Sequence, residues 1–254
     1  MGYCPRLLIC ENDPETAAEL TLRLVHAGFW VEHATTTAEA LGRLERQSFD
    51  LLLMNLILPD QDSLSFCREL RILGIRLPTL ITEFDRIHTR AHPDSGFHLS
   101  EGRSNDGEPE WVRKAAAQAR MIFSIKTSCL RARGYQPRIL HLEADPFCAG
   151  LVGAALRKGV HLTQVADPGE LARAATEDPY DLVALNPAFP RDALLPAFDR
   201  LLNQCPHTPI LLRCRFPVGT EAADMRSDRQ DCGLMEMIQA MVLRSVAIPL
   251  CAHA

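Results

Sequence analysis

Two asparagines end two apolar runs of the same pattern. The runs are residues 50–56 (Asp-Leu-Leu-Leu-Met-Asn-Leu) and residues 181–186 (Asp-Leu-Val-Ala-Leu-Asn). A continuous apolar run of this length is typical of a strand buried on both faces, as in a parallel sheet. We therefore expect Asn55 and Asn186 at the carboxyl ends of their strands, the edge where open α/β sheets place their sites. A side-chain amide offers hydrogen bonds there, but it has no anionic oxygen for nucleophilic attack.

Acidic residues follow the first apolar run of each half. Glu11, Asn12 and Asp13 come after residues 6–10, and Glu143 and Asp145 come after residues 138–142. Asp13 and Asp145 each precede a proline, which is the pattern of a helix N-cap followed by proline in the first turn. Caps and solvated loop residues are the simpler interpretation of these carboxylates, because half a carboxylate set binds Mg²⁺ weakly.

Alternating strands and helices must position these residues. Strands are expected at residues 6–10, 29–34, 50–56 and 77–82, with helices at residues 14–27, 37–44 and 64–73. Ala18, Leu22 and Val25 have the spacing of a buried face on the first helix. Short connections between such elements imply right-handed βαβ units and a parallel sheet.

The pattern changes after residue 82. Residues 83–108 are polar and rich in Gly, Ser, Asp and His, with residues 96–100 as a candidate fifth strand. A helix is expected from residue 108 to about residue 133, long enough to be both a final helix and a connector to the second half.

The second half repeats the first. Arg138 lies 132 positions after Arg6, and Pro209 lies 131 positions after Pro78. Strands are expected at residues 138–142, 160–165, 181–186 and 208–213, with helices at residues 169–176, 194–202 and 233–246. A repeat of this length indicates tandem domains, here residues 1–134 and 135–254, because solenoid repeats are shorter.

These motifs resemble the receiver domains of response regulators. The resemblance rests on the acidic cluster after the first strand, the run Asp-Leu-(apolar)₃ before Asn55, and the same order of motifs in the second half. It implies two flavodoxin-like (CheY-like) α/β receiver domains, each a parallel sheet flanked by helices, joined by a helical connector. Such domains place two acids for Mg²⁺ after the first strand, a phosphoacceptor aspartate after the third, a hydroxyl after the fourth and a lysine after the fifth.

The resemblance also shows what this chain lacks. Asn55 and Asn186 stand at the two phosphoacceptor positions, and Asn12 and Ala144 replace the second acid. Thr82 corresponds to the hydroxyl position of the first domain. Glu101 corresponds to the lysine position, so the charge there is reversed.

In the second domain Arg213 or Cys214 falls near the hydroxyl position, and no lysine follows Lys158 in the chain. The implied protein is therefore a pair of degenerate receivers, with no catalytic residue, no metal and no cofactor. It is expected to act in signalling through protein–protein contacts, independently of aspartyl phosphorylation.

The composition and charge of the chain argue against nucleic-acid binding and against a membrane protein. The net charge of −5 gives no support for nucleic-acid binding, and no apolar run approaches the roughly 18 residues of a membrane span. The protein is expected to be cytoplasmic. The expected partners are a sensor kinase, another regulator or an output protein, with a homodimer as a further option. Residues 83–108 are the preferred partner surface, because they fall on the face that receivers use for output.

Two alternatives stay open. Nine cysteines without a C-x-x-C pair suit reduced, buried thiols, but Cys10 and Cys214 end strands and would suit a redox-responsive regulator if they were semi-exposed. A displaced acceptor residue would instead leave a conventional phosphoreceiver. His88, His92 and His98 are a weak candidate for a metal site, since such a site needs three or four converging ligands.

Overall fold

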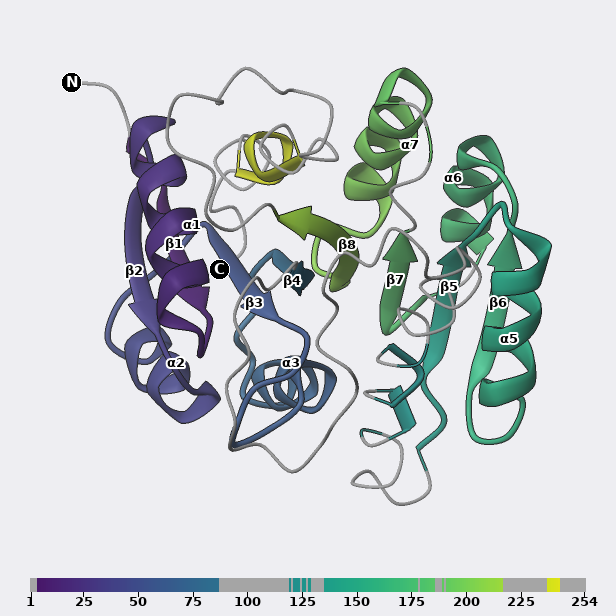
Figure 1. Cartoon of the computed structure of the whole chain (residues 1–254), viewed down its shortest axis with the longest axis horizontal. Helices are drawn as coiled ribbons and strands as arrows, with labels where there is room; N and C mark the ends of the chain where they lie inside the picture. The colour runs from purple at the N-terminus through teal and green to yellow at the C-terminus, as the bar shows by residue number, and fades with distance from the viewer. Residues whose placement is uncertain are drawn as a thin grey trace, which may run out of the picture.

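The described strands form a single eight-stranded parallel sheet with helices on both faces (Figure 1). The structure is a computed structural model. It describes residues 4–86, 119, 121–123, 125–126, 128, 135–177, 179–185, 189, 191–216 and 237–242. The predicted fifth strand at residues 96–100, Glu101 and Asn186 lie outside these residues.

The first half runs β1 (Arg6–Cys10), α1 (Pro14–His26), β2 (Trp30–Ala34), α2 (Thr37–Leu44), β3 (Leu51–Asn55), α3 (Ser63–Ile72) and β4 (Thr79–Arg86). The second half runs β5 (Arg138–Leu142), α5 (Pro146–Leu156), β6 (His161–Val165), α6 (Pro168–Glu177), β7 (Leu182–Leu185), α7 (Arg191–Gln204) and β8 (Ile210–Phe216). Residues 119–128, in part, and 237–242 are also helical. The predicted order of strands and helices is thus confirmed for the elements that fall within the described residues.

The two halves join edge to edge through their last described strands. The strand order is β2-β1-β3-β4-β8-β7-β5-β6, and β4 pairs with β8 in parallel over seven residue pairs, from Leu80↔Ile210 to Arg86↔Phe216. The expectation of a separate parallel sheet in each half is therefore wrong. β4 is also longer than predicted, because its pairing with β8 extends it to Arg86. Glu83–Arg86 therefore belongs to the centre of the sheet, which removes it from the predicted partner surface.

Alternate strand residues point to opposite faces of the sheet, and each face has its own core. One core holds Leu7, Ile9, Leu51, Leu53 and Leu80 with α1, α6, α7 and segment 237–242. The other holds Leu8, Leu52, Met54, Ile81 and Leu211 with α2, α3, α5 and Met121 and Ile125 of segment 119–128. Residues 51–54 are all at most 1% exposed, which confirms a strand buried on both faces.

The internal repeat extends to individual hydrogen bonds. The Arg6 amide donates to Asp50 Oδ2 at 2.7 Å, and the Arg138 amide donates to Asp181 Oδ2 at 2.8 Å. Leu52 N donates to the Pro78 carbonyl, and Val183 N donates to the Pro209 carbonyl, both at 3.0 Å. α1 and its counterpart α5 lie on opposite faces of the common sheet. The halves are therefore related by a rotation about an axis parallel to the strands, between β4 and β8.

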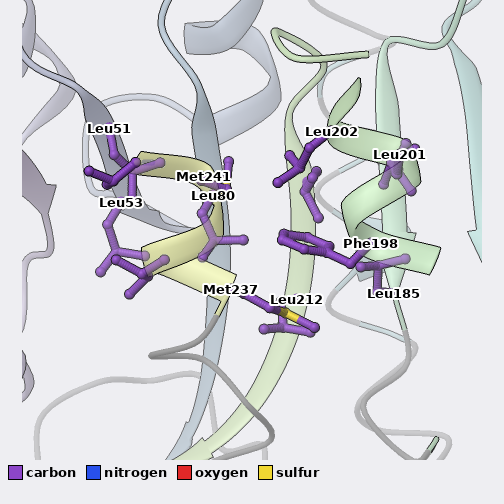
Figure 2. Packing of buried hydrophobic residues seen from close by; sticks show 14 of the residues in the cluster. Leu51, Leu53, Leu80, Leu185, Phe198, Leu201, Leu202, Leu212, Met237 and Met241 are labelled. Carbon is purple, nitrogen blue, oxygen red and sulfur yellow. The ribbon is translucent and has the colours of Figure 1, made fainter. Parts of the chain in front are cut away.

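Segment 237–242 closes the core over this junction. Figure 2 shows Met241 beside Leu51, Leu53 and Leu80, and Met237 beside Leu212 of β8. Both methionines are at most 1% exposed. Residues from the end of the second half therefore cover β3 and β4 of the first half, and the two halves share the core on this face of the sheet.

The buried face of α1 differs from the prediction. Thr16, Ala17, Leu20 and Leu24 are buried, whereas Leu22 and Val25 are 55% and 50% exposed. The error has a simple cause: α1 carries apolar residues around much of its circumference, so that spacing alone supports more than one face.

Candidate functional site

Glu11 and Asn55 meet at the carboxyl edge of the first half, as the sequence predicts. Glu11 follows β1 directly and is 1% exposed, and Asn55 is the last residue of the neighbouring strand β3. Asn55 Nδ2 donates a hydrogen bond to Glu11 Oε1 at 3.0 Å. The amide must present its NH₂ group here, because its oxygen would repel the carboxylate. Asn55 thus ties the end of β3 to the acidic residue after β1.

The other members of the acidic cluster have structural roles. Asp13 is the N-cap of α1, and its Oδ1 accepts hydrogen bonds from Thr16 N at 2.8 Å and Thr16 Oγ1 at 2.7 Å. Its own backbone amide donates to Glu11 Oε1 at 2.9 Å. Asn12 between them is exposed. The cap predicted at Asp13 is confirmed.

Thr82 does not present its hydroxyl at the edge of the sheet. It pairs with Asn55 in register, is fully buried, and donates from Oγ1 to the Met54 carbonyl at 3.3 Å. β4 continues beyond it to Arg86. The assignment of Thr82 to the switch-hydroxyl position is therefore wrong, because its side chain is sealed between β3 and β4.

Asp60 is a carboxylate near this edge whose role the sequence did not reveal. It accepts hydrogen bonds from Thr37 N at 3.1 Å, Ala38 N at 3.0 Å and Thr37 Oγ1 at 2.8 Å, at the start of α2. Partial burial pushes its pKa upward, but these donors outweigh that effect and the pKa is lowered overall. The Pro-Asp pair after β3 is the only local signal, and the 23-residue separation from Thr37 hides the contact.

The second half repeats the acidic geometry. Glu143 is 4% exposed, and its Oε1 accepts a hydrogen bond from Asp145 N at 2.9 Å, as Glu11 does from Asp13. Asp145 caps α5 by accepting from Phe147 N at 2.9 Å. Whether Asn186 approaches Glu143 stays a prediction, since Asn186 is outside the described residues.

Cys10 is not the semi-exposed thiol that a redox switch needs. It is fully buried between β1 and α2, and its Sγ–H donates to the Thr36 carbonyl at 3.4 Å. Burial, together with the nearby carboxylates of Asp60 and Glu11, raises its pKa to about 12. The thiol is therefore neutral near pH 7 and a poor nucleophile. Cys214 lies in β8 opposite Phe84, and its side chain is outside the described part.

Two absences in the described part of the chain bear on other classes of site. Within that part of the chain, no three His, Cys, Asp or Glu side chains converge in a way that could hold a metal ion. His88, His92 and His98 lie outside it. None of the helices that the structure describes has the length and apolar character of a membrane span.

A family model for the response regulator receiver domain matches residues 7–90. This range contains β1 to β4, and with them Glu11, Asn55 and Thr82. Residues 7–90 therefore form a response regulator receiver domain, which confirms that part of the resemblance.

Curated relatives of the chain are transcriptional regulators. The transcriptional regulatory protein TrcR of Mycobacterium tuberculosis is 26% identical over 190 residues, which cover 74% of this chain and 66% of TrcR. The cell cycle transcriptional regulator CtrA of Caulobacter vibrioides is 26% identical over 136 residues, which cover 53% of this chain and 54% of CtrA. The chain thus spans between about half and two thirds of the length of these relatives.

Solved structures also match part of the chain. A sensor protein from Polaromonas sp. JS666 is 35% identical, covers 32% of this chain and 66% of its own, and has a TM-score of 0.31. The receiver domain of a signal transduction histidine kinase from Syntrophus aciditrophicus is 26% identical, covers 33% of this chain and 64% of its own, and also has a TM-score of 0.31.

Proposed function

We propose that this chain is a non-enzymatic signalling protein built from two receiver units, and that it acts by protein–protein contact independently of aspartyl phosphorylation. The observation that carries this proposal is the hydrogen bond from Asn55 Nδ2 to Glu11 Oε1. The amide occupies the phosphoacceptor position and has no anionic oxygen to attack phosphorus. It also takes up the oxygen of Glu11 that faces it, so the pair forms a fixed link between β1 and β3.

The internal repeat supports extending the proposal to residues 135–254. The matching bonds of Asp50 and Asp181, and of Glu11 and Glu143, are those expected if the second half is a second receiver unit. Asn186 and Ala144 stand at its acceptor and second acid positions. Both units then lack the nucleophile and one acid.

We propose a sensor kinase, another regulator or an output protein as the partner, in keeping with relatives that are named as transcriptional regulators. The partner surface is assigned to residues 87–108, because Glu83–Arg86 is paired within the sheet. Replacing residues 87–108 with a Gly-Ser linker should abolish capture of a bound signalling protein without unfolding the domain. Capture at wild-type strength by this variant would refute the assignment.

Intact mass spectrometry tests the central claim. The protein is incubated with Mg²⁺ and acetyl phosphate, beside a receiver domain that keeps its aspartate as the positive control. We expect the mass of this chain to stay unchanged while the control gains one phosphoryl group. A phosphoryl adduct on this chain would overturn the proposal, and peptide mapping would then identify the displaced acceptor.

The redox alternative now depends on Cys214, because Cys10 is buried and neutral. Mild oxidant should change the oligomeric state of the wild type but not of Cys214→Ser if this alternative is correct. The same response in both proteins, or no response in either, would exclude Cys214.

A further inference from the structure

A groove lies between the two halves at the amino ends of β4 and β8, opposite the edge that carries Glu11 and Asn55. One cavity of about 140 Å³ is lined by residues of α3 and the connection to β4, together with His207 and Pro209. A second cavity of about 450 Å³ is lined by residues 204–208, by Pro179 and Tyr180, and by Arg71. Arg71 and His207 line both cavities, so the two cavities adjoin.

The internal repeat brings two basic positions together in this groove. His207 lies 131 positions after Arg76, the same offset that relates Pro209 to Pro78, so these residues hold equivalent positions in the two halves. The parallel pairing of β4 with β8 places their preceding connections side by side. Arg76 and His207 therefore lie on either side of the axis that relates the halves, and Arg71 is a third cation in the same groove.

Among the described residues, the lining of the groove carries more positive than negative charge. No Asp or Glu is among the described residues that line either cavity. Asp181 pairs with Arg71 Nη1 at 2.8 Å and also accepts a hydrogen bond from the Arg138 amide. Its negative charge therefore neutralises the charge of Arg71. Within the described part of the chain, Arg76 has no carboxylate at ion-pair distance. An arginine presents several N–H donors in a planar fork that matches a phosphate group.

We propose that this groove binds a small phosphorylated molecule, with its phosphate group held between Arg76 and His207. The larger cavity is open to solvent and adjoins His207, so the remainder of the ligand can extend along it. Arg71 keeps its contact with Asp181 at the border of the two cavities. Because both halves supply a basic group, bound phosphate also strengthens the junction between them.

The state of His207 gives this site a dependence on pH. Partial burial, and then the charge of Arg76, lower the pKa of His207 below its ordinary value of 6.5. Among the described residues that line the two cavities, the other titratable or charged groups are Arg71, which pairs with Asp181, and Cys67, Cys205 and Tyr180. A phosphate beside the ring stabilises the imidazolium form and raises its pKa. Binding is thus stronger below the midpoint of His207 in the complex and weaker above it.

Calorimetric titration of the full chain with pyrophosphate, at constant ionic strength and pH 6, tests the proposal. We expect saturable binding that weakens about tenfold or more in Arg76→Gln and in His207→Gln, since each removes one charge-assisted contact. The control is Arg157→Gln, which removes an exposed arginine at the end of α5 and changes the net charge equally. Its affinity should equal that of the wild type.

Nuclear magnetic resonance of the His207 ring supplies the second measurement. Saturating pyrophosphate should raise the pH midpoint of His207 in the wild type and in Arg157→Gln. The absence of saturable binding, an equal loss of affinity in Arg76→Gln and Arg157→Gln, or an unmoved His207 midpoint would each overturn the proposal. Neither measurement uses a phosphodonor or a partner protein, so a negative result here does not bear on the proposed signalling function.

Discussion

Replacing Asn55 by aspartate restores the residue that receivers use and tests whether the Glu11–Asn55 contact is a fixed link. The substitution places a carboxylate oxygen where Nδ2 now lies, 3.0 Å from Glu11 Oε1. Two charges at that distance repel by about 5–6 kcal/mol at an effective dielectric constant of about 20. The pair can avoid this repulsion by binding one proton. At pH 7 protonating a carboxylate with an ordinary pKa of about 4 costs about 4 kcal/mol, which is therefore the upper limit of the destabilisation.

We therefore expect Asn55→Asp to lower the free energy of unfolding by about 2–4 kcal/mol at pH 7 in EDTA. The lower bound is the loss of a hydrogen bond to a charged group, about 1.5–3 kcal/mol. The variant pair has a raised carboxyl pKa in the folded state, so the folded state binds more protons than the unfolded state above about pH 4. The destabilisation should consequently be small below pH 4 and grow as the pH rises through that window.

Urea unfolding followed by far-UV circular dichroism measures these quantities. Addition of 10 mM Mg²⁺ should restore about 1.4 kcal/mol to Asn55→Asp if the restored pair binds the ion with a Kd of about 1 mM. The matched control is Asn55→Ala, which loses the hydrogen bond but gains no charge and should not respond to Mg²⁺. An aspartate variant as stable as the wild type in EDTA, or an equal response of both variants to Mg²⁺, would refute the reasoning.

Three further predictions concern the fold around the site. Leu80→Ala should lower the free energy of unfolding by about 2–5 kcal/mol, because Leu80 is fully buried beneath segment 237–242. Urea should still unfold both halves of this variant in one transition, and two separate transitions would contradict a shared core. Iodoacetamide at pH 8 should modify exposed Cys4 but should spare Cys10 and Cys67 until denaturant is added, because burial raises the pKa of both thiols to about 12. Labelling of either buried thiol in the native protein, detected by mass spectrometry, would contradict this prediction. Asp60→Ala should lower the free energy of unfolding by about 1 kcal/mol, because it removes the hydrogen-bond acceptor at the start of α2. The pKa of Asp60 is lowered in the folded protein, so this difference in stability should shrink as the pH falls below 3.8. A difference that stays constant down to pH 2 would exclude a role for the carboxylate charge.

The sequence predicts the part of the site that depends on local rules and on the resemblance to receiver domains. Asp13 was identified as an N-cap because a capping residue, a proline and a helix follow one another in the sequence. The resemblance to receiver domains places Glu11 and Asn55 in one pocket, and the parallel pairing of β1 with β3 brings them to the same edge. The burial of Cys10 agrees with the reduced, buried thiols that the cysteine spacing favours. The burial of Thr82 was missed, because it depends on which strands and helices cover the face that its side chain takes.

The sequence by itself determined the order of strands and helices, the parallel sheet and the internal repeat, since periodicity, caps and breakers act over a few residues. Only the tertiary structure decided that the halves share one sheet through β4 and β8, and that α1 and α5 cover opposite faces. Pairing between distant strands depends on which edges remain uncovered after each half has folded, and no local pattern records that choice. The same junction brought Arg76 and His207 into one groove, although 131 residues separate them in the chain.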